Sequence, residues 1–355
     1  MKVARLYSFT DIRIEDVPVP EIGPRDALIR TRACGICSGD VMPWYIEKKA
    51  PLVLGHEPAG EIVELGKELK NSPLSVGSRV FVHHHAPCMS CPCCERGDHV
   101  QCETWRATKI IPGGVSEYIL VSEMNLRNDT LRLPGALNFE DGTLVEPTAC
   151  VVKSLKRARM RKGDTVLVIG LGVMGQMHVL LAREFGARTV IAADMVPYRL
   201  RKALEFGADS AIDVSNPSPP LDKEGCKGDG LVERVRELTG GRMADIVVVG
   251  PNSADAMLQG IETVAPGGTV SLFTPAKPGE LLRIDPNKLY FHDISLVTSY
   301  SCGPDDTKEA LRLIGKGLVT AEKLVSHRFP IEQTEKAYRL TSEAKESLKC
   351  LITFS

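Results

Sequence analysis

Five cysteines fall within one short stretch of the chain, "CMSCPCCERGDHVQC". Structural zinc is held by four ligands, and thiolates spaced two residues apart can converge on one ion. Cys93 and Cys94 are sequence neighbours whose side chains usually diverge, so one of them must be left out, and local spacing does not decide which. A site of four thiolates has no open position, so it would be structural rather than catalytic. One set with the spacing C-x2-C-x2-C-x7-C is Cys88, Cys91, Cys94 and Cys102.

Two other uses of the cysteine cluster stay open at this point. Sets of four cysteines also hold iron–sulfur clusters. Zinc modules occur in nucleic-acid-binding proteins too, although no basic patch flanks this one. The histidine run His83–His85 lies just before the cluster. Histidines in a run at a strand end more often form a polar surface or line a cleft than bind a metal, and we expect that here.

A second, sparser set of residues could form an open metal site. Cys37 lies in "ACGICSGD", His56 and Glu57 lie in "LGHEPAGE", and Glu146 lies in "LVEPTA". Thiolate, imidazole and carboxylate are suitable zinc ligands, and three of them leave a position for a reacting molecule. Cys34 and Cys37 could instead be a redox C-x-x-C pair. No thioredoxin-like βαβ context surrounds them, which disfavours that interpretation.

A glycine pattern in "VIGLGVMGQ" predicts a dinucleotide site. Gly170, Gly172 and Gly175 form G-x-G-x-x-G, with Val173 and Met174 opening the predicted helix. The pattern is weak alone, but here it follows a predicted strand. The first glycine makes the tight turn, the second lets the backbone approach a pyrophosphate, and the third lets helix pack on strand. The helix start supplies free N–H groups to the phosphates.

A carboxylate stands where the adenosine ribose would bind. Asp194 ends the next predicted strand, 19 residues beyond Gly175. A carboxylate there accepts hydrogen bonds from the ribose hydroxyls and repels a 2′-phosphate, so Asp194 favours NAD over NADP. Arg199 lies nearby, and such a cation sometimes accommodates the phosphate. An ordinary turn residue at a strand end is the alternative interpretation of Asp194.

The pattern of predicted secondary structure divides the chain into two kinds of region. Residues 1 to about 148 read as mostly β, with short strand-like runs such as "DALIRTRA" and "SEYILV". From about 153 to 298, strands alternate with helices, which predicts a parallel sheet covered on both faces. The tail returns to mixed helices and strands. The fold class is therefore α/β, and the irregular insert from Ser215 to Gly230 is interpreted as a mobile surface loop.

Composition excludes several classes of protein. The 355 residues favour two domains, and 43% apolar residues suffice for a sizeable core. The net charge of -1 gives no general attraction to nucleic acid or anionic membranes. The sequence shows no secretory leader and no apolar run long enough to span a bilayer. Eleven cysteines without a leader suggest metal binding in a reducing compartment, and we expect a cytoplasmic protein.

Together these motifs resemble one known family. The segments "ACGICSGD", "LGHEPAGEIVELG", "CMSCPCCERGDHVQC", "LVEPTACVV" and "VIGLGVMGQ" stand in the order and spacing of the zinc-dependent medium-chain alcohol dehydrogenases. The chain looks most like the polyol branch, which includes sorbitol and threonine dehydrogenases. The resemblance implies a GroES-like zinc-binding catalytic domain from residues 1–149 and 299–355. It also implies a Rossmann NAD-binding domain, a doubly wound parallel sheet, from residues 150–298.

The resemblance also implies two zinc ions per chain. Carried over by position, the catalytic zinc ligands are Cys37, His56 and Glu57. Glu146 matches a position that is a fourth ligand in some members and a water-linked carboxylate in the polyol branch. Cys34 matches a non-ligand position. The structural zinc falls on Cys88, Cys91, Cys94 and Cys102, which leaves Cys93 spare.

One departure from the family concerns the proton route. Members commonly carry Ser or Thr two residues after the ligand cysteine, where the hydroxyl passes on the substrate proton, and some place a histidine three residues further along. Here those positions hold Gly39 and Met42. Ser38 is then the nearest hydroxyl and our candidate catalytic residue. Glu57, Glu146 or water could serve instead.

The function implied by the resemblance is the reversible oxidation of a secondary alcohol of a polyol or sugar to a ketone, with NAD as hydride acceptor. The partner would be a small-molecule alcohol or ketone, and the enzyme a homodimer or homotetramer. The same fold could act as a carbonyl reductase or as a threonine-type amino-alcohol dehydrogenase. An alternative of another class is a noncatalytic NAD-binding zinc protein that has lost its relay hydroxyl.

Overall fold

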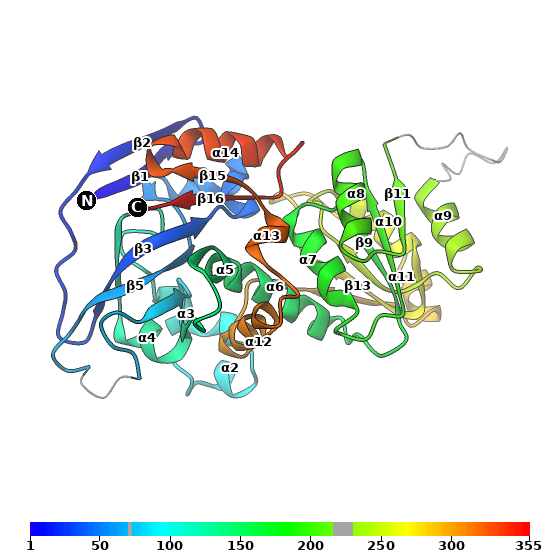
Figure 1. Ribbon diagram of the computed structural model, residues 1–355. Coiled ribbons are helices and arrows are strands. Elements are labelled where there is room, and N and C mark those ends of the chain that lie inside the picture. Colours follow the sequence, from blue (N-terminus) through cyan, green and yellow to red (C-terminus); the bar gives the residue numbers. More distant parts are fainter. Residues whose placement is uncertain (70–72, 216–229) are drawn as a thin grey trace. The chain divides into compact units, whose positions relative to one another are not determined.

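The computed structural model describes residues 1–69, 73–215 and 230–355, and these residues form two compact units. The first unit comprises Met1–Ala149 and Ser301–Ser355, and the second comprises Cys150–Tyr300 (Figure 1). The first unit is thus assembled from both ends of the sequence, whereas the second is one continuous segment.

The described part of the first unit is built on a seven-stranded sheet. Its order is β15-β16-β3-β5-β6-β8, with β7 paired to β3 off this path, and a three-stranded sheet of order β2-β1-β4 accompanies it. The strands are β1 Lys2–Ser8, β2 Asp11–Asp16, β3 Ala27–Gly35, β4 Leu52–Val53, β5 Glu57–Leu65, β6 Arg79–Val82, β7 Tyr118–Val121, β8 Thr130–Arg132, β15 Val325–Pro330 and β16 Lys349–Thr353.

Short helices connect these strands. In the first half of the chain they are η1 Ser38–Val41, α1 Pro43–Ile46, η2 Glu47–Lys49, α2 Pro92–Glu95, η3 His99–Gln101, α3 Glu103–Ala107, α4 Glu123–Asp129, α5 Phe139–Thr143 and α6 Val145–Arg157, the last of which runs on into the second unit. Near the carboxyl end they are α12 Pro304–Gly315, α13 Ala321–Leu324, η4 Ile331–Gln333 and α14 Thr334–Glu343.

The helices α4 to α6 correct the description of residues 1–148 as mostly β. The sequence there contains Gly142 and Pro147, which read as breakers between strands. Pro147 instead occupies the first turn of α6, where the backbone N–H has no intrahelical partner to lose. Asn138 and Asp141 form a reciprocal capping box that starts α5. The element that carries Glu146 is therefore a helix.

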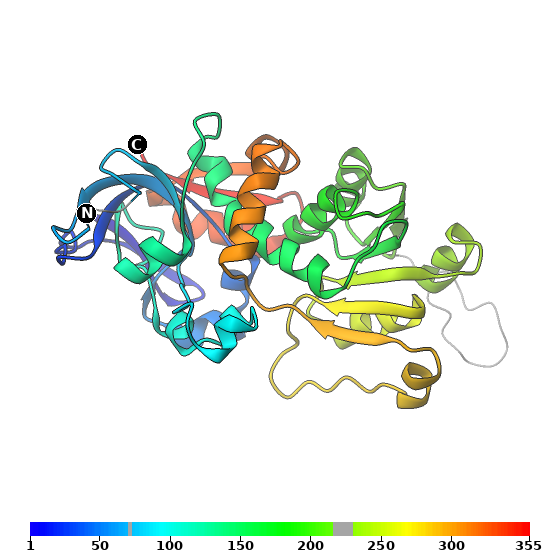
Figure 2. The same ribbon diagram turned by 90° about the horizontal axis from the view of Figure 1, so that it is seen from below.

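The second unit has the alternating strands and helices that the sequence predicts. Its described strands pair in parallel in the order β11-β10-β9-β12-β13-β14, and several lie side by side in Figure 2. The order reverses at β9, where successive strands are added on opposite sides. The elements are β9 Thr165–Ile169, α7 Val173–Ala182, β10 Thr189–Asp194, α8 Pro197–Glu205, β11 Ser210–Asp213, α9 Gly230–Leu238, β12 Ala244–Val249, α10 Ala254–Glu262, β13 Val264–Leu272, α11 Pro286–Phe291 and β14 Ser295–Thr298.

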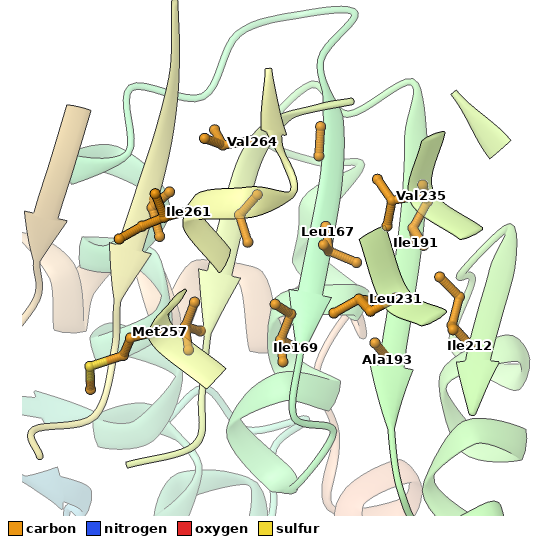
Figure 3. Close-up of a cluster of buried hydrophobic side chains, with 14 residues drawn as sticks. Leu167, Ile169, Ile191, Ala193, Ile212, Leu231, Val235, Met257, Ile261 and Val264 are labelled. Atoms are coloured by element: carbon orange, nitrogen blue, oxygen red, sulfur yellow. The ribbon is translucent and has the colours of Figure 1, made fainter. Parts of the chain in front are cut away.

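Both faces of this parallel sheet are apolar because helices cover both. Leu167 and Ile169 of β9 face one cluster, which also contains Leu231 of α9 and Ile261 of α10 (Figure 3). The alternate β9 residues face a second cluster, with side chains of α7 and α8. A strand with period-two side chains and two covered faces must be apolar throughout, as "TVLVI" is. This confirms the doubly wound sheet.

Most of the insert predicted as a mobile loop, residues 216–229, lies outside the described residues. Across the described ranges, every helix is too short or too polar to span a membrane.

Candidate functional site

Four cysteines of the first unit converge on one point. Each of the four offers a sulfur, and these sulfurs all lie within 4.8 Å of one another. The Cys91 and Cys94 sulfurs are 3.5 Å apart, and those of Cys88 and Cys102 are 3.6 Å apart. Zn–S bonds of about 2.3 Å in a tetrahedron place sulfurs about 3.8 Å apart. The group Cys88, Cys91, Cys94 and Cys102 therefore fits a four-thiolate zinc site.

The turn α2 determines which of the two adjacent cysteines joins this group. Pro92 starts the turn directly after Cys91, and Cys94 is its buried residue. Cys93 lies outside the group and receives a contact from Arg96 Nη2 at 3.8 Å. Hydrogen bonds from Ser90 lower the pKa of Cys88 to about 6, which favours the thiolate form that a metal binds.

Cys37, His56 and Glu57 form a second group of donor atoms within 4.8 Å of one another. The pairing of two strands brings them together. Gly35, the last residue of β3, lies opposite Glu57, the first residue of β5. Cys37 follows β3 by two residues and caps the start of η1, and His56 immediately precedes β5. A cysteine sulfur, an imidazole and a carboxylate thus meet where β3 ends and the neighbouring strand β5 begins.

Asp40 orients the imidazole of this group. Its Oδ2 lies 3.1 Å from His56 Nδ1, so Nε2 is the nitrogen available to a metal. Burial opposes a charge on His56, but Asp40 and the Cys37 sulfur outweigh burial and raise the pKa of His56 well above its usual value.

A buried lysine, which sequence reasoning missed, holds Glu57. Lys349 Nζ contacts Glu57 Oε2 and donates a hydrogen bond to the Ile36 carbonyl at 3.0 Å. Burial raises the pKa of Glu57, Lys349 lowers it, and the neighbouring Glu146 carboxylate raises it further. The pKa of Glu57 is therefore raised above its usual value. A Cβ on Gly35 would lie 1.9 Å from Glu57 Oε2, so only glycine leaves room for this pair. The sequence feature that could have revealed this pair is the lysine at the start of β16, a strand that is otherwise mostly apolar.

Glu146 lies near Glu57 but forms a closer group with other residues. Its donor atom lies within 4.8 Å of those of His83 and Cys302, all three of them buried. The expectation that the histidine run forms a polar surface or lines a cleft is therefore wrong for His83. Its ring is fully buried, with Nδ1 2.6 Å from Asp129 Oδ2. His84 lies beside the second group, with its ring centroid 4.8 Å from that of His56.

Ser38 is the first residue of η1, next to Cys37, and is exposed. The Gly39 N–H donates to Cys37 Sγ at 3.3 Å. A Cβ on Gly39 would meet Cys37 Sγ at 3.5 Å and Met42 Cε at 3.9 Å, which are ordinary contacts. The backbone therefore has room for a side chain at residue 39 as well as at residue 38. In this sequence the hydroxyl is carried by Ser38 and not by residue 39.

In the second unit, the three glycines occupy the turn from β9 to α7. Gly170 has φ +85°, which favours glycine. A Cβ on Gly175 would lie 2.0 Å from the Gly170 carbonyl oxygen, whereas one on Gly172 would meet nothing within 4 Å. Gly172 thus faces open space at the start of α7. The helix begins at Val173 and Met174, whose N–H groups point out of its first turn, so the turn fits a pyrophosphate.

Asp194 ends β10 beside this turn. Its Oδ2 accepts a hydrogen bond from Leu171 N–H at 2.6 Å, and its Oδ1 accepts one from Val196 N–H at 2.8 Å. Arg199 Nη1 lies 3.6 Å from Oδ2. The carboxylate is therefore fixed at the carboxyl end of the strand next to the glycine turn, where dinucleotides bind in doubly wound sheets.

Comparisons with known proteins agree with this architecture. Residues 23–130 match the alcohol dehydrogenase GroES-like domain, and residues 173–316 match the zinc-binding dehydrogenase domain. An L-threonine 3-dehydrogenase from Symbiobacterium thermophilum is 32% identical over 96% of this chain and 93% of its own length. A sorbitol dehydrogenase from Halalkalibacterium halodurans is 30% identical over 96% of this chain and 95% of its own length.

Solved structures share the whole fold. The alcohol dehydrogenase TADH from Thermus sp. ATN1 superimposes with a TM-score of 0.83 at 26% identity and covers 100% of both chains. A 2R,3R-butanediol dehydrogenase from Bacillus subtilis superimposes with a TM-score of 0.84 at 24% identity. The superposition covers 100% of this chain and 99% of the butanediol dehydrogenase chain.

A GroES-like unit that gathers zinc-type ligands and a Rossmann sheet together define a zinc-binding, nicotinamide-dependent oxidoreductase. The chain belongs to the zinc-dependent medium-chain alcohol dehydrogenase superfamily, and within it to the polyol branch. The predicted fold class and family are thereby confirmed.

Proposed function

We propose that this enzyme oxidises a secondary alcohol of a polyol or sugar to the ketone, reversibly, with NAD as hydride acceptor. The observation that carries the proposal is the convergence of Cys37, His56 and Glu57 within 4.8 Å. Three protein ligands leave a position for substrate, whereas the four-thiolate group leaves none. The group of Cys37, His56 and Glu57 would hold the catalytic zinc and the four-thiolate group the structural zinc, which makes two ions per chain for this function.

Each residue of the proposed site has a task in this reaction. Bound zinc supplies a Lewis acid that lowers the pKa of an alcohol oxygen, and NAD supplies the hydride acceptor. Asp40 keeps the His56 ring oriented, and Lys349 keeps the Glu57 carboxylate in place. Loss of hydride from carbon leaves one proton to be removed from oxygen. Ser38, beside Cys37, is the hydroxyl that would pass it towards water.

The second unit would bind the cofactor. Gly170, Gly172 and Gly175 admit the pyrophosphate to the start of α7, next to Val173 and Met174. The Asp194 carboxylate would accept hydrogen bonds from the ribose hydroxyls and repel a 2′-phosphate, which supports NAD over NADP. The Arg199 guanidinium forms an ion pair with the Asp194 carboxylate, so we do not expect it to bind a 2′-phosphate.

The substrate class rests on the relatives. Sorbitol dehydrogenases recur among them, from Bombyx mori at 29% identity over 98% of this chain to Bacillus subtilis at 28% identity over 99%. The L-threonine 3-dehydrogenase relative supports an amino alcohol as the second candidate. The complete set of ligands and the glycine turn argue against a noncatalytic NAD-binding protein.

Compartment and assembly are part of the same proposal. The ten cysteines of the described residues form no disulfide with one another, which supports a reducing cytoplasm. A homodimer or homotetramer is proposed from the family resemblance.

A substrate panel tests the proposal. Polyols, sugars and amino alcohols are assayed with NAD and NADP side by side, for the wild type and for Cys37→Ser. We expect NAD reduction with a polyol, and loss of both the activity and one zinc ion in Cys37→Ser. A fully zinc-loaded protein without turnover on the whole panel would contradict the proposed function. Turnover confined to amino alcohols would favour the second candidate.

A further inference from the structure

A third group of metal-type donors lies in the first unit, and the proposed function does not use it as a metal site. His83 directly follows β6, Glu146 is the second residue of α6, and Cys302 lies just before α12. Their exposed fractions are 0%, 5% and 0%. One donor atom from each lies within 4.8 Å of the others. Three separate elements therefore bring a nitrogen, an oxygen and a sulfur to one buried point.

The distance between the sulfur and nitrogen atoms fits two ligands of one ion. Cys302 Sγ lies 3.7 Å from His83 Nε2. Bonds of about 2.3 Å to sulfur and about 2.0 Å to nitrogen in a tetrahedron place the two atoms about 3.5 Å apart. The sulfurs of the four-thiolate group, at 3.5 to 4.0 Å, show the same kind of spacing.

A chain of hydrogen bonds fixes the imidazole in the orientation that a ligand needs. Asp129 Oδ2 lies 2.6 Å from His83 Nδ1, which directs Nε2 to the Cys302 sulfur. The Thr307 hydroxyl donates to Asp129 Oδ1 at 2.5 Å. Asp129, like His83, has almost no exposed surface. A carboxylate on the second nitrogen is the usual support of a metal-binding histidine.

We propose that His83, Glu146 and Cys302 form a further divalent-metal site, with zinc as the expected ion. Thiolate, imidazole and carboxylate are zinc donors, and the set of three leaves a fourth position open. A divalent cation would also offset the charge of the buried Asp129 and Glu146 carboxylates, of which Glu146 interacts in addition with Lys349. The site goes beyond the proposed function and does not depend on it.

Metal counting on the full-length protein tests the site. Metal-depleted protein is titrated with Zn²⁺, and the bound ions per chain are counted by mass spectrometry after gel filtration. We expect three ions in the wild type and two in Cys302→Ser. Serine keeps an O–H that can hydrogen-bond His83 but is a poor zinc ligand, so a mere hydrogen bond would survive this change. Asp129→Asn should weaken the third ion about 10- to 100-fold.

Two matched variants separate this site from the others. Cys350→Ala removes an equally buried thiol that packs in an apolar cluster, and it should bind as many ions as the wild type. Cys37→Ser should lose one ion, the proposed catalytic zinc, and keep the ion at His83. A wild type that saturates at two ions, or a Cys302→Ser variant with the wild-type count, would overturn the further site. An unchanged count in Cys37→Ser would count against the proposed catalytic zinc alone.

Discussion

Lys349 and Glu57 form an ion pair whose two side chains are each 1% exposed. Lys349→Met leaves the carboxylate buried without its partner, which typically costs about 3–5 kcal/mol of unfolding free energy. Glu57→Gln combined with Lys349→Met removes both charges and should recover much of that loss. Chemical denaturation of the metal-depleted proteins measures both effects, because Glu57 is also a proposed zinc ligand. A Lys349→Met variant as stable as the wild type would show that the pair does not stabilise the fold.

Cys91 and Cys93, two residues apart in the sequence, should differ sharply in their contribution to zinc binding. Cys91→Ser removes one of the converging sulfurs, so we expect loss of one zinc ion and a lower Tm, because structural zinc sites contribute folding free energy. Cys93→Ser is the matched control, since Cys93 lies outside the group, and it should keep wild-type zinc content and Tm. Equal effects of the two substitutions would mean that the ligands are assigned incorrectly.

Asp194 should govern the choice between NAD and NADP. Asp194→Ser removes a charged acceptor, and hydrogen bonds to charged groups contribute about 1.5–3 kcal/mol. The ratio of kcat/KM for NAD to that for NADP should therefore fall about 10- to 100-fold. Asp213→Ser is the control, because Asp213 is the register partner of Asp194 at the end of the neighbouring strand and is exposed. An unchanged ratio in Asp194→Ser would remove the basis for the NAD assignment.

The proton route can be tested by moving the hydroxyl. Ser38→Ala should lower kcat about 100-fold, the lower end of what a positioned proton-transfer group contributes. Gly39 has room for a Cβ, so adding Gly39→Ser to Ser38→Ala should restore part of kcat without changing the zinc content. Full activity in Ser38→Ala would transfer the role to a carboxylate or water.

A buried histidine should make the second unit sensitive to acid. His178 Nδ1–H donates to the Met174 carbonyl at 2.8 Å, and Nε2 lies 3.2 Å from Ser154 Oγ. Burial lowers the pKa of His178 to about 4. The folded state thus prefers the neutral ring, and this contribution is complete above about pH 6.5, the unfolded value.

The contribution is lost as the pH falls from about 6.5 towards about 4, by up to about 1.4 kcal/mol for each pH unit. His178→Gln cannot take up this proton, so its unfolding free energy should fall less steeply with acid. Urea denaturation at several pH values gives both slopes. Parallel slopes for the two proteins would show that His178 is not the group responsible.

The residues predictable from sequence are those whose partners are close along the chain. The cysteine group spans residues 88–102, and the glycine turn lies between one strand and the next helix, so spacing alone carries their geometry. Cys37 and His56 also follow once the antiparallel pairing of β3 with β5 is assumed.

The residues that escaped prediction depend on distant contacts. Lys349 reaches Glu57 only because β16 pairs with β3. His83 reads as a polar strand end until Asp129 and Cys302 are placed against it. The description of residues 1–148 as mostly β leaves Glu146 off any helix, although the proline that follows it suits the first turn of one. No local periodicity encodes such long-range pairs.

The pairing of β16 with β3 also sets an order of events during synthesis. Residues 150–300 form a continuous unit, so they can collapse on their own contacts while translation proceeds. The Glu57 carboxylate leaves the ribosome 292 residues before Lys349, its buried counter-charge. The nascent amino-terminal half must therefore keep this acid hydrated or protonated until the tail arrives, and we expect it to need chaperone protection longer than the segment inserted within it.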